Sequence, residues 1–253
     1  MKRIIPFVAA VLVALSTQAQ TVNVHMADGT TQTYLGSQVE YINFNATNIP
    51  DTLKAVDLGL PTGTKWASIN IGADIPEGDG FYFSWGEIEP KTRRHFGWEN
   101  YKYGYWDDNL NIGILTKYNS NDGLTTLEPS DDAATMLWGE EWCIPTKEDF
   151  EELIANTDMR MRHHKGIPVV EFKSKSSDKA IILPAAGYNG GQQYNFDDTR
   201  DYAGFYYTST LDTSNNCMKA YSFIFSMNQT EITNIWSRPD GYSIRPVKKN
   251  KKQ

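Results

Sequence analysis

The sequence predicts an α+β domain in which two short helices pack on an antiparallel sheet. Residues 127–155 have the pattern of a helix, a tight turn and a second helix. Between residues 169 and 247, short runs rich in aromatic and β-branched residues are separated by Gly, Pro, Asn and Asp, as in antiparallel strands. Helices followed by a series of strands are typical of α+β domains.

Capping residues mark both predicted helices. Ser130 is expected to cap the first helix and Gly139 to end it. In the second helix, Thr146 and Asp149 form a capping-box pattern. Two short helices cannot bury their apolar faces alone, so we expect both to cover a sheet. The apolar residues at helical spacing are Ala134, Leu137 and Trp138 in the first helix and Phe150, Leu153 and Ile154 in the second.

Residues 1–19 have the composition of a secretory signal peptide. Lys2 and Arg3 precede an apolar run that is too short to span a bilayer. The small residues Thr17 and Ala19 allow cleavage after residue 19. We therefore expect a protein without a transmembrane segment that is secreted, periplasmic or displayed at the cell surface.

The mature chain is expected to contain a small domain and a large one. Alternating apolar residues around an Asp28-Gly29 turn signal predict a three-stranded meander. A meander of this size is marginally stable alone, so residues 21–44 are a candidate contact for an envelope assembly partner. The predicted boundaries are 20–44 for the meander, 45–53 for a polar linker, 54–248 for the main domain and 249–253 for a basic tail.

The charge of the chain argues against nucleic acid as a partner. Its formal net charge is −7, and it has no basic stripe. Removal of the two signal-peptide cations would lower this charge to about −9.

Several motifs spread along the main domain carry a family resemblance. They are VDLGLPTGTKWA at 56–67, YFSWGE at 82–87, DDAAT at 131–135, WCIPT at 142–146, LPAAGY at 183–188 and SIRPV at 243–247. In this order they resemble the FISUMP family, the major paralogous domain of bacterial cell-envelope proteins, over residues 54–248. That family resembles C-type-lectin-like folds, in which two helices pack on a twisted antiparallel sheet and long irregular loops carry the binding residues. The resemblance implies export and binding or adhesion, as in Bacteroidetes surface proteins, and implies no particular ligand.

Aromatic residues in irregular segments are the candidate binding residues. Trp106, Tyr194, Tyr202 and Trp236 would stack on sugar faces or fill a protein hot spot. The alternative for these residues is packing, because long loops also bury their own aromatic side chains. The motif tryptophans, which lie in helix or strand patterns, are expected in the core instead.

Acidic loops make calcium the only candidate cofactor. Asp107, Asp108 and Asn109 offer oxygen ligands, as do residues 119–123. A third group is formed by Asp197 and Asp198 with Asp201. No segment has full EF-hand spacing, and such loops are also typical of solvated turns. We expect no other metal, and no catalytic motif indicates a reaction, so the chain is predicted to be non-enzymatic.

Two covalent features stay open. Cys143 and Cys217 allow one disulfide in an exported chain without requiring it. Asp51-Thr52-Leu53 fits the short pattern that exported Bacteroidetes proteins use for O-glycosylation at threonine, here Thr52.

The predicted function is an exported, non-enzymatic module that binds a glycan or a surface protein through the loops of a C-type-lectin-like domain. One alternative is a structural component of an envelope or appendage assembly. Another is a glycan-active hydrolase, which would need two carboxyl groups about 5–10 Å apart in one cleft.

Overall fold

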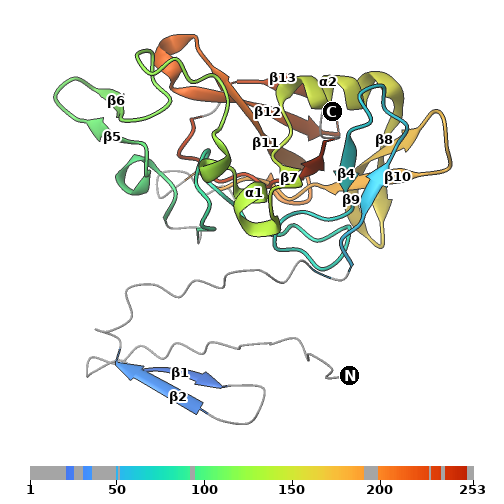
Figure 1. Ribbon diagram of the computed structural model, residues 1–253, viewed down its shortest axis with the longest axis horizontal. Helices are drawn as coiled ribbons and strands as arrows, with labels where there is room; N and C mark the ends of the chain where they lie inside the picture. Colours follow the sequence, from blue (N-terminus) through green and yellow to red (C-terminus); the bar gives the residue numbers. More distant parts are fainter. Residues whose placement is uncertain are drawn as a thin grey trace. The chain divides into compact units, whose positions relative to one another are not determined.

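The computed structural model describes residues 21–25, 31–35, 50, 52–91, 95–190, 199–227, 229–234 and 237–249. The chain divides into two compact units, residues 1–48 and 49–253 (Figure 1). In the first unit, β1 (Thr21–His25) pairs antiparallel with β2 (Thr31–Leu35). The predicted signal peptide and the third strand of the meander lie outside the described residues.

The second unit is mostly β. Over all the residues that the structure describes, strands contain 38% and helices 14%. The described strands form four antiparallel sheets, with the orders β3-β4-β14-β7, β5-β6, β10-β9-β8 and β11-β12-β13. The strands are β3 (Ala55–Asp57), β4 (Lys65–Ala67), β5 (Gly104–Asp107), β6 (Ile112–Leu115), β7 (Trp142–Cys143), β8 (Thr157–His164), β9 (Ile167–Ser174), β10 (Ala180–Pro184), β11 (Ala203–Asp212), β12 (Lys219–Ser226), β13 (Gln229–Thr233) and β14 (Val247–Lys248).

This architecture shows that the predicted α+β, C-type-lectin-like fold is wrong. The helices α1 (Ala133–Trp138) and α2 (Lys147–Asn156) do not form a layer on one sheet. Phe150 of α2 is buried in a cluster with residues of β9, β10 and β12, whereas Trp138 of α1 belongs to a separate cluster. The apolar spacing within each helix shows which face is buried, but it does not show what covers that face. The prediction failed at this second step.

The helix ends confirm one capping prediction and correct another. In α2 the Asp149 N–H donates to Thr146 Oγ1 at 3.2 Å, and the Thr146 N–H donates to Asp149 Oδ2 at 2.7 Å, which completes the predicted capping box. In α1 the cap is Asp132 and not Ser130. Ser130 lies inside a preceding 3₁₀ turn, so its side chain is too early in the chain to cap α1.

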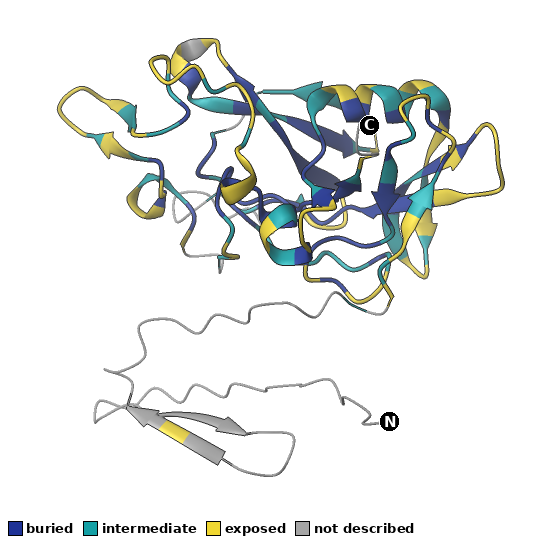
Figure 2. Cartoon of the chain, in the orientation of Figure 1, coloured by how far each residue is buried: buried dark blue, intermediate teal, exposed yellow. Residues whose placement is uncertain are grey.

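The motif tryptophans lie in the core, as the sequence predicts. Trp66, Trp85, Trp138 and Trp142 are at most 6% exposed. Figure 2 shows that β11 and β12 are largely buried, whereas the tip of the β5–β6 hairpin is exposed. The described core therefore contains both the motif tryptophans and most of β11 and β12, whereas the hairpin tip lies outside it.

The last strand completes a sheet that begins near the start of the second unit. β14 lies between β4 and β7. Val247 of β14 pairs with Trp66 of β4 on one side and with Cys143 of β7 on the other. Val247 is fully buried. Three segments that are distant in the sequence therefore share one sheet.

Candidate functional site

The β5–β6 hairpin projects from the rest of the second unit (Figure 1). It exposes large apolar side chains. Tyr105 is 52% exposed, Trp106 41%, Leu110 62% and Ile112 46%. Single exposed apolar residues are ordinary, but a group of them on one element indicates an interaction surface.

The tip of the hairpin is held by its own side chains. Asp107 Oδ1 accepts hydrogen bonds from the backbone N–H groups of Asn109 at 2.9 Å and Leu110 at 3.1 Å. Asn111 adopts a left-handed conformation, with φ of 52°, which Asn tolerates better than most residues. The polar tip sequence therefore fixes the turn, and the exposed rings stand on an ordered strand pair.

Two glycines on the inner face of the hairpin make room for Trp98. A Cβ atom at Gly113 would lie 2.6 Å from Trp98 Cη2 and 2.4 Å from Met218 Cε, and one at Gly104 would lie 3.1 Å from Trp98 Cζ3. Trp106 is directly opposite Gly113, so its side chain is on the same face. The ring centroids of Trp98 and Trp106 are 6.1 Å apart, with an interplanar angle of 48°. We call Trp98 and Trp106 the indole pair.

The indole pair rests on a buried hydrogen-bond network. Trp98 packs edge-to-face on Tyr101, with ring centroids 5.9 Å apart. The Tyr101 hydroxyl donates to the Trp85 carbonyl at 2.9 Å and accepts from Arg238 Nε at 2.9 Å. Arg238 is fully buried and also donates to the backbone carbonyls of Tyr118 and Cys217. This network gives the inner indole a rigid support, which a binding site needs.

A buried carboxylate anchors the segment that leads into the hairpin. Asp131 accepts from the Tyr103 hydroxyl at 2.5 Å, from Lys117 Nζ at 2.5 Å and from the Tyr118 hydroxyl at 2.7 Å. Burial opposes ionisation of Asp131, but these hydrogen bonds outweigh burial and hold its pKa below the usual value. Burial raises the pKa of Tyr118 to about 12. At neutral pH Asp131 is therefore ionised and Tyr118 is neutral, and neither changes its protonation state. Both side chains serve to position the chain.

The structure separates the binding residues that the sequence singles out. Trp106 lies in the indole pair, whereas Tyr202 is 68% exposed in the turn before β11. Tyr194 and Trp236 lie outside the described residues. Sequence reasoning missed Trp98, although a signal existed. Gly104 and Gly113 interrupt a segment rich in aromatic residues, and glycine in a strand often marks the close approach of another group.

The structure also describes the two cysteines and the threonine that are candidates for covalent modification. Cys143 is half-buried and Cys217 is buried, and both are free thiols, so the disulfide that the sequence allows is not formed in the structure. Burial raises the pKa of Cys143 to about 12, which leaves it a poor nucleophile at neutral pH. Thr52 is exposed, as a modified residue would have to be.

The structure tests the expectations about metal binding and membrane spans only for the residues that it describes. Within them, no group of three or more His, Cys, Asp or Glu side chains is arranged to hold a metal ion. Calcium binding stays a prediction. None of the helices in the described ranges is both long enough and apolar enough to cross a membrane.

No family model matches the chain, and no match was found among characterised proteins or solved structures. The geometry of the hairpin is therefore the basis for inferring a function.

Proposed function

We propose that this protein is an exported, non-enzymatic binding module that adheres to glycans through the β5–β6 hairpin. The observation that carries the proposal is the indole pair, two adjacent rings on a projecting hairpin with an ordered support. Export rests on the composition of residues 1–19, and the resemblance to the FISUMP family favours the same kind of function.

The chemistry around the indole pair suits a sugar. The C–H faces of a pyranose ring are apolar and stack on aromatic rings, while its hydroxyl groups need hydrogen-bond partners at the ring edge. Trp106 is 41% exposed, and Trp98 is half-buried beside it. The exposed side chains of Asp108 and Asn109 at the hairpin tip supply polar partners. A pyranose ring that lies on Trp106 would thus meet both kinds of group.

A protein partner is the second candidate, because the other face of the hairpin is different. Tyr105 and Ile114 are paired across the strands, as are Asp107 and Ile112, so these side chains share the outer face. Tyr105 and Ile112 are about half exposed. Aliphatic side chains suit a protein surface better than a sugar, and such a contact would fit a structural component of an envelope assembly.

Binding of the mature protein to an array of host and microbial glycans tests the first candidate. We expect Trp106→Ala to weaken binding at least about tenfold, or about 1.4 kcal/mol, through loss of a stacking face. Tyr202→Ala, which removes an exposed ring outside the hairpin, is the matched control and should bind normally. Thermal unfolding should be similar for both variants, because both rings are substantially exposed.

Three outcomes would change the proposal. An absence of binding to every glycan, with Ca²⁺ and with EDTA, would overturn the glycan proposal and favour the protein partner. Loss of binding in Tyr202→Ala but not in Trp106→Ala would move the site to the turn before β11. Release of shortened products from a bound glycan would show that the protein is a hydrolase.

A further inference from the structure

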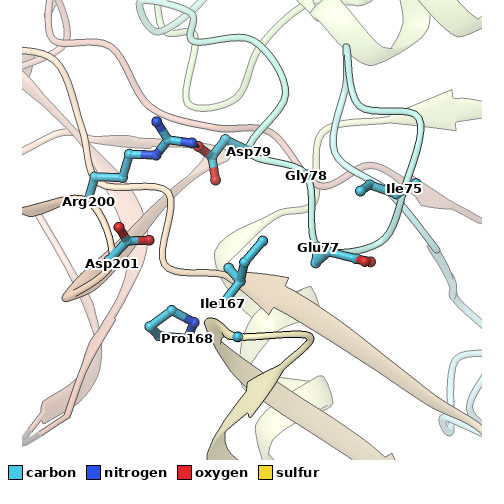
Figure 3. Close-up of a pocket in the computed structure, with 9 residues that line it drawn as sticks. Ile75, Glu77, Gly78, Asp79, Ile167, Pro168, Arg200 and Asp201 are labelled. Atoms are coloured by element: carbon cyan, nitrogen blue, oxygen red, sulfur yellow. Dashed lines mark ion pairs between the residues drawn. The ribbon is translucent and has the colours of Figure 1, made fainter.

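A pocket of about 600 Å³ opens between three loops of the second unit (Figure 3). Its walls come from residues 75–79, from residues 166–168 at the β8–β9 turn, and from residues 200–201 before β11. This volume lies within the range of about 300–1,000 Å³ that is usual for small-molecule sites. None of the hairpin residues lines this pocket.

One side of the pocket carries two carboxyl groups and a single guanidinium. Arg200 Nη2 lies 2.6 Å from Asp79 Oδ2. Figure 3 shows the Asp201 side chain beside this ion pair. Burial and the charge of Asp201 raise the pKa of Asp79, although Arg200 lowers it. Asp201 forms no ion pair with any residue that the structure describes. The group of three therefore has one excess negative charge.

Glu77 does not change this balance, because Lys165, which lies outside the pocket lining, neutralises its charge. The Glu77 Oε1 atom lies 2.5 Å from Lys165 Nζ. Glu77 is only 3% exposed, and its Oε2 atom forms no hydrogen bond with any residue that the structure describes. The pocket lining therefore contains a buried carboxylate oxygen that can accept a hydrogen bond from a ligand. The Glu77–Lys165 ion pair instead joins the loop at residues 75–79 to the β8–β9 turn.

The opposite wall of the pocket is apolar. Ile167 and Pro168 lie across from the charged group, and Ile75 stands at one end (Figure 3). Ile75 is 48% exposed, so it adds accessible apolar surface to the pocket. The pocket is thus apolar on one side and anionic on the other.

We propose that this pocket binds a primary ammonium group carried on an aliphatic stem. The ammonium would lie between Asp79 and Asp201, and the stem would lie on Ile167 and Pro168. An anionic ligand would meet two carboxylates and a guanidinium that is already paired. A neutral ligand would leave the excess charge unbalanced. The ammonium can belong to a free amine or to a lysine side chain. The proposal is independent of the hairpin function.

Titration of the mature protein with three ligands of five carbon atoms each tests the charge requirement. Pentylamine should bind at least about tenfold more tightly than 1-pentanol, and pentanoate should bind more weakly than either. Raising the ionic strength should weaken only the binding of pentylamine. Equal binding of pentylamine and 1-pentanol, or tighter binding of pentanoate, would overturn the proposal.

Asp201→Asn tests the assigned site. Asp201 has φ of 68°, and its N–H donates to the Ala185 carbonyl at 2.9 Å. Asn tolerates this left-handed conformation, so the loop should keep its shape. We expect pentylamine to bind at least about fivefold more weakly to this variant. Asp178→Asn removes the same charge from an exposed position outside the pocket lining and should leave binding unchanged.

Two further measurements identify the source of the ammonium and separate this site from the hairpin. Capped lysine that binds at least as tightly as pentylamine would indicate a protein side chain, whereas weaker binding would indicate a free amine. Trp106→Ala should bind pentylamine normally even if it loses glycan binding. Loss of pentylamine binding in Trp106→Ala, with Asp201→Asn unaffected, would contradict the pocket proposal.

Discussion

Two carboxyl groups, the buried Asp131 and the partly buried Asp240, respond to their surroundings in opposite directions. Lys117, Tyr103 and Tyr118 donate to Asp131 and keep its pKa low despite burial. Asp240 has one backbone hydrogen bond, from Ser237, and burial raises its pKa to about 7. The number of donors that reach each oxygen pair decides which effect prevails.

Asp240→Asn should make the protein more stable above pH 7. The folded pKa of Asp240 is above its unfolded value of 3.8, so its contribution to stability is fully present below about pH 4. That contribution is lost as pH rises through about 7. Asparagine at this position does not ionise, so the variant does not lose this stability as the pH rises. We expect the variant to match the wild type near pH 4 and to exceed it at pH 8 by at least about 1 kcal/mol, measured by urea unfolding.

The matched control for this prediction is Asp108→Asn, which changes an exposed acid at the hairpin tip. It should leave the pH dependence of stability unchanged. Parallel stability curves for Asp240→Asn and the wild type between pH 4 and pH 8 would show that Asp240 ionises normally in the folded protein.

At the scale of single residues, the sequence predicts which side chains are buried better than it predicts which residues they contact. The four motif tryptophans are buried as expected because each stands among small or apolar neighbours within a regular pattern. The partners of Arg238 and Arg245, by contrast, cannot be read from the sequence. Arg245 is fully buried and donates to Asn70 Oδ1 at 2.8 Å, and these residues are brought together only by the fold.

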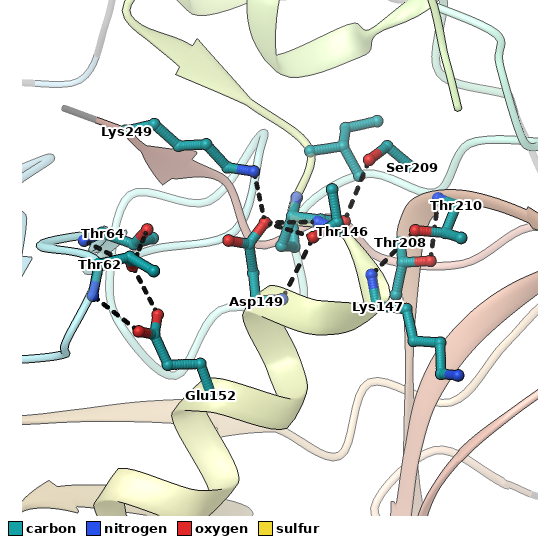
Figure 4. Close-up of polar contacts among 12 residues, drawn as sticks. Thr62, Thr64, Thr146, Lys147, Asp149, Glu152, Thr208, Ser209, Thr210 and Lys249 are labelled. Carbon is teal, nitrogen blue, oxygen red and sulfur yellow. Dashed lines mark hydrogen bonds and ion pairs between the residues drawn. The ribbon is translucent and has the colours of Figure 1, made fainter. Parts of the chain in front are cut away.

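Among the elements, α2 shows which contacts a local sequence pattern can predict and which it cannot (Figure 4). Its capping box is encoded within four consecutive residues and was predictable. Glu152, on the exposed face of α2, accepts from the Thr62 N–H at 2.8 Å and from Thr62 Oγ1 at 2.7 Å. Asp149 forms an ion pair with Lys249 at 2.8 Å. A helical pattern predicts polar residues at both positions, but it does not predict which distant segments they hold.

Gly113→Ala should disturb the β5–β6 hairpin without unfolding the protein. The added methyl group would collide with the Trp98 ring and with Met218. We expect a loss of stability of about 1–3 kcal/mol. Displacement of Trp98 should also change the near-ultraviolet circular dichroism of the indole pair and weaken glycan binding.

Gly123→Ala is the comparison for this variant. Gly123 has φ of 70° and no heavy atom within 4 Å of the position of an added Cβ. Alanine there should lower the free energy of unfolding by only about 1–2 kcal/mol, because a Cβ atom disfavours the left-handed backbone conformation. It should leave the indole signal unchanged. A change of the indole signal in Gly123→Ala, or none in Gly113→Ala, would contradict the described packing of Trp98.

For the whole molecule, the presence of many strands in the later part of the chain was predictable. The way in which the strands pair into sheets was not. The alternating runs near β9–β13 indicate strands because local sequence sets the periodicity. The order β3-β4-β14-β7 depends on pairing between residues far apart in sequence, for which a single sequence contains no local signal. The α+β prediction followed from two helices that are real but pack in different clusters.

Removal of residues 245–253 should abolish cooperative folding. This deletion removes β14 and the buried Arg245, which donates to Asn70 and to the Ala67 carbonyl. The strands β4 and β7 would then lose the strand between them. Removal of residues 250–253 alone should preserve the urea unfolding transition. A cooperative transition in the longer deletion would show that β14 is dispensable.

The position of β14 also has a consequence for biogenesis. During synthesis the ribosome releases β4 and β7 long before residues 247–248, and domains fold as their parts emerge. The gap between these two strands cannot close until residues 247–248 have been translated. Until then the sheet is incomplete, and the segment from β4 to β7 can still pass through a narrow channel. For the exported protein proposed here, closure of this sheet would wait until residues 247–248 have crossed the translocation channel.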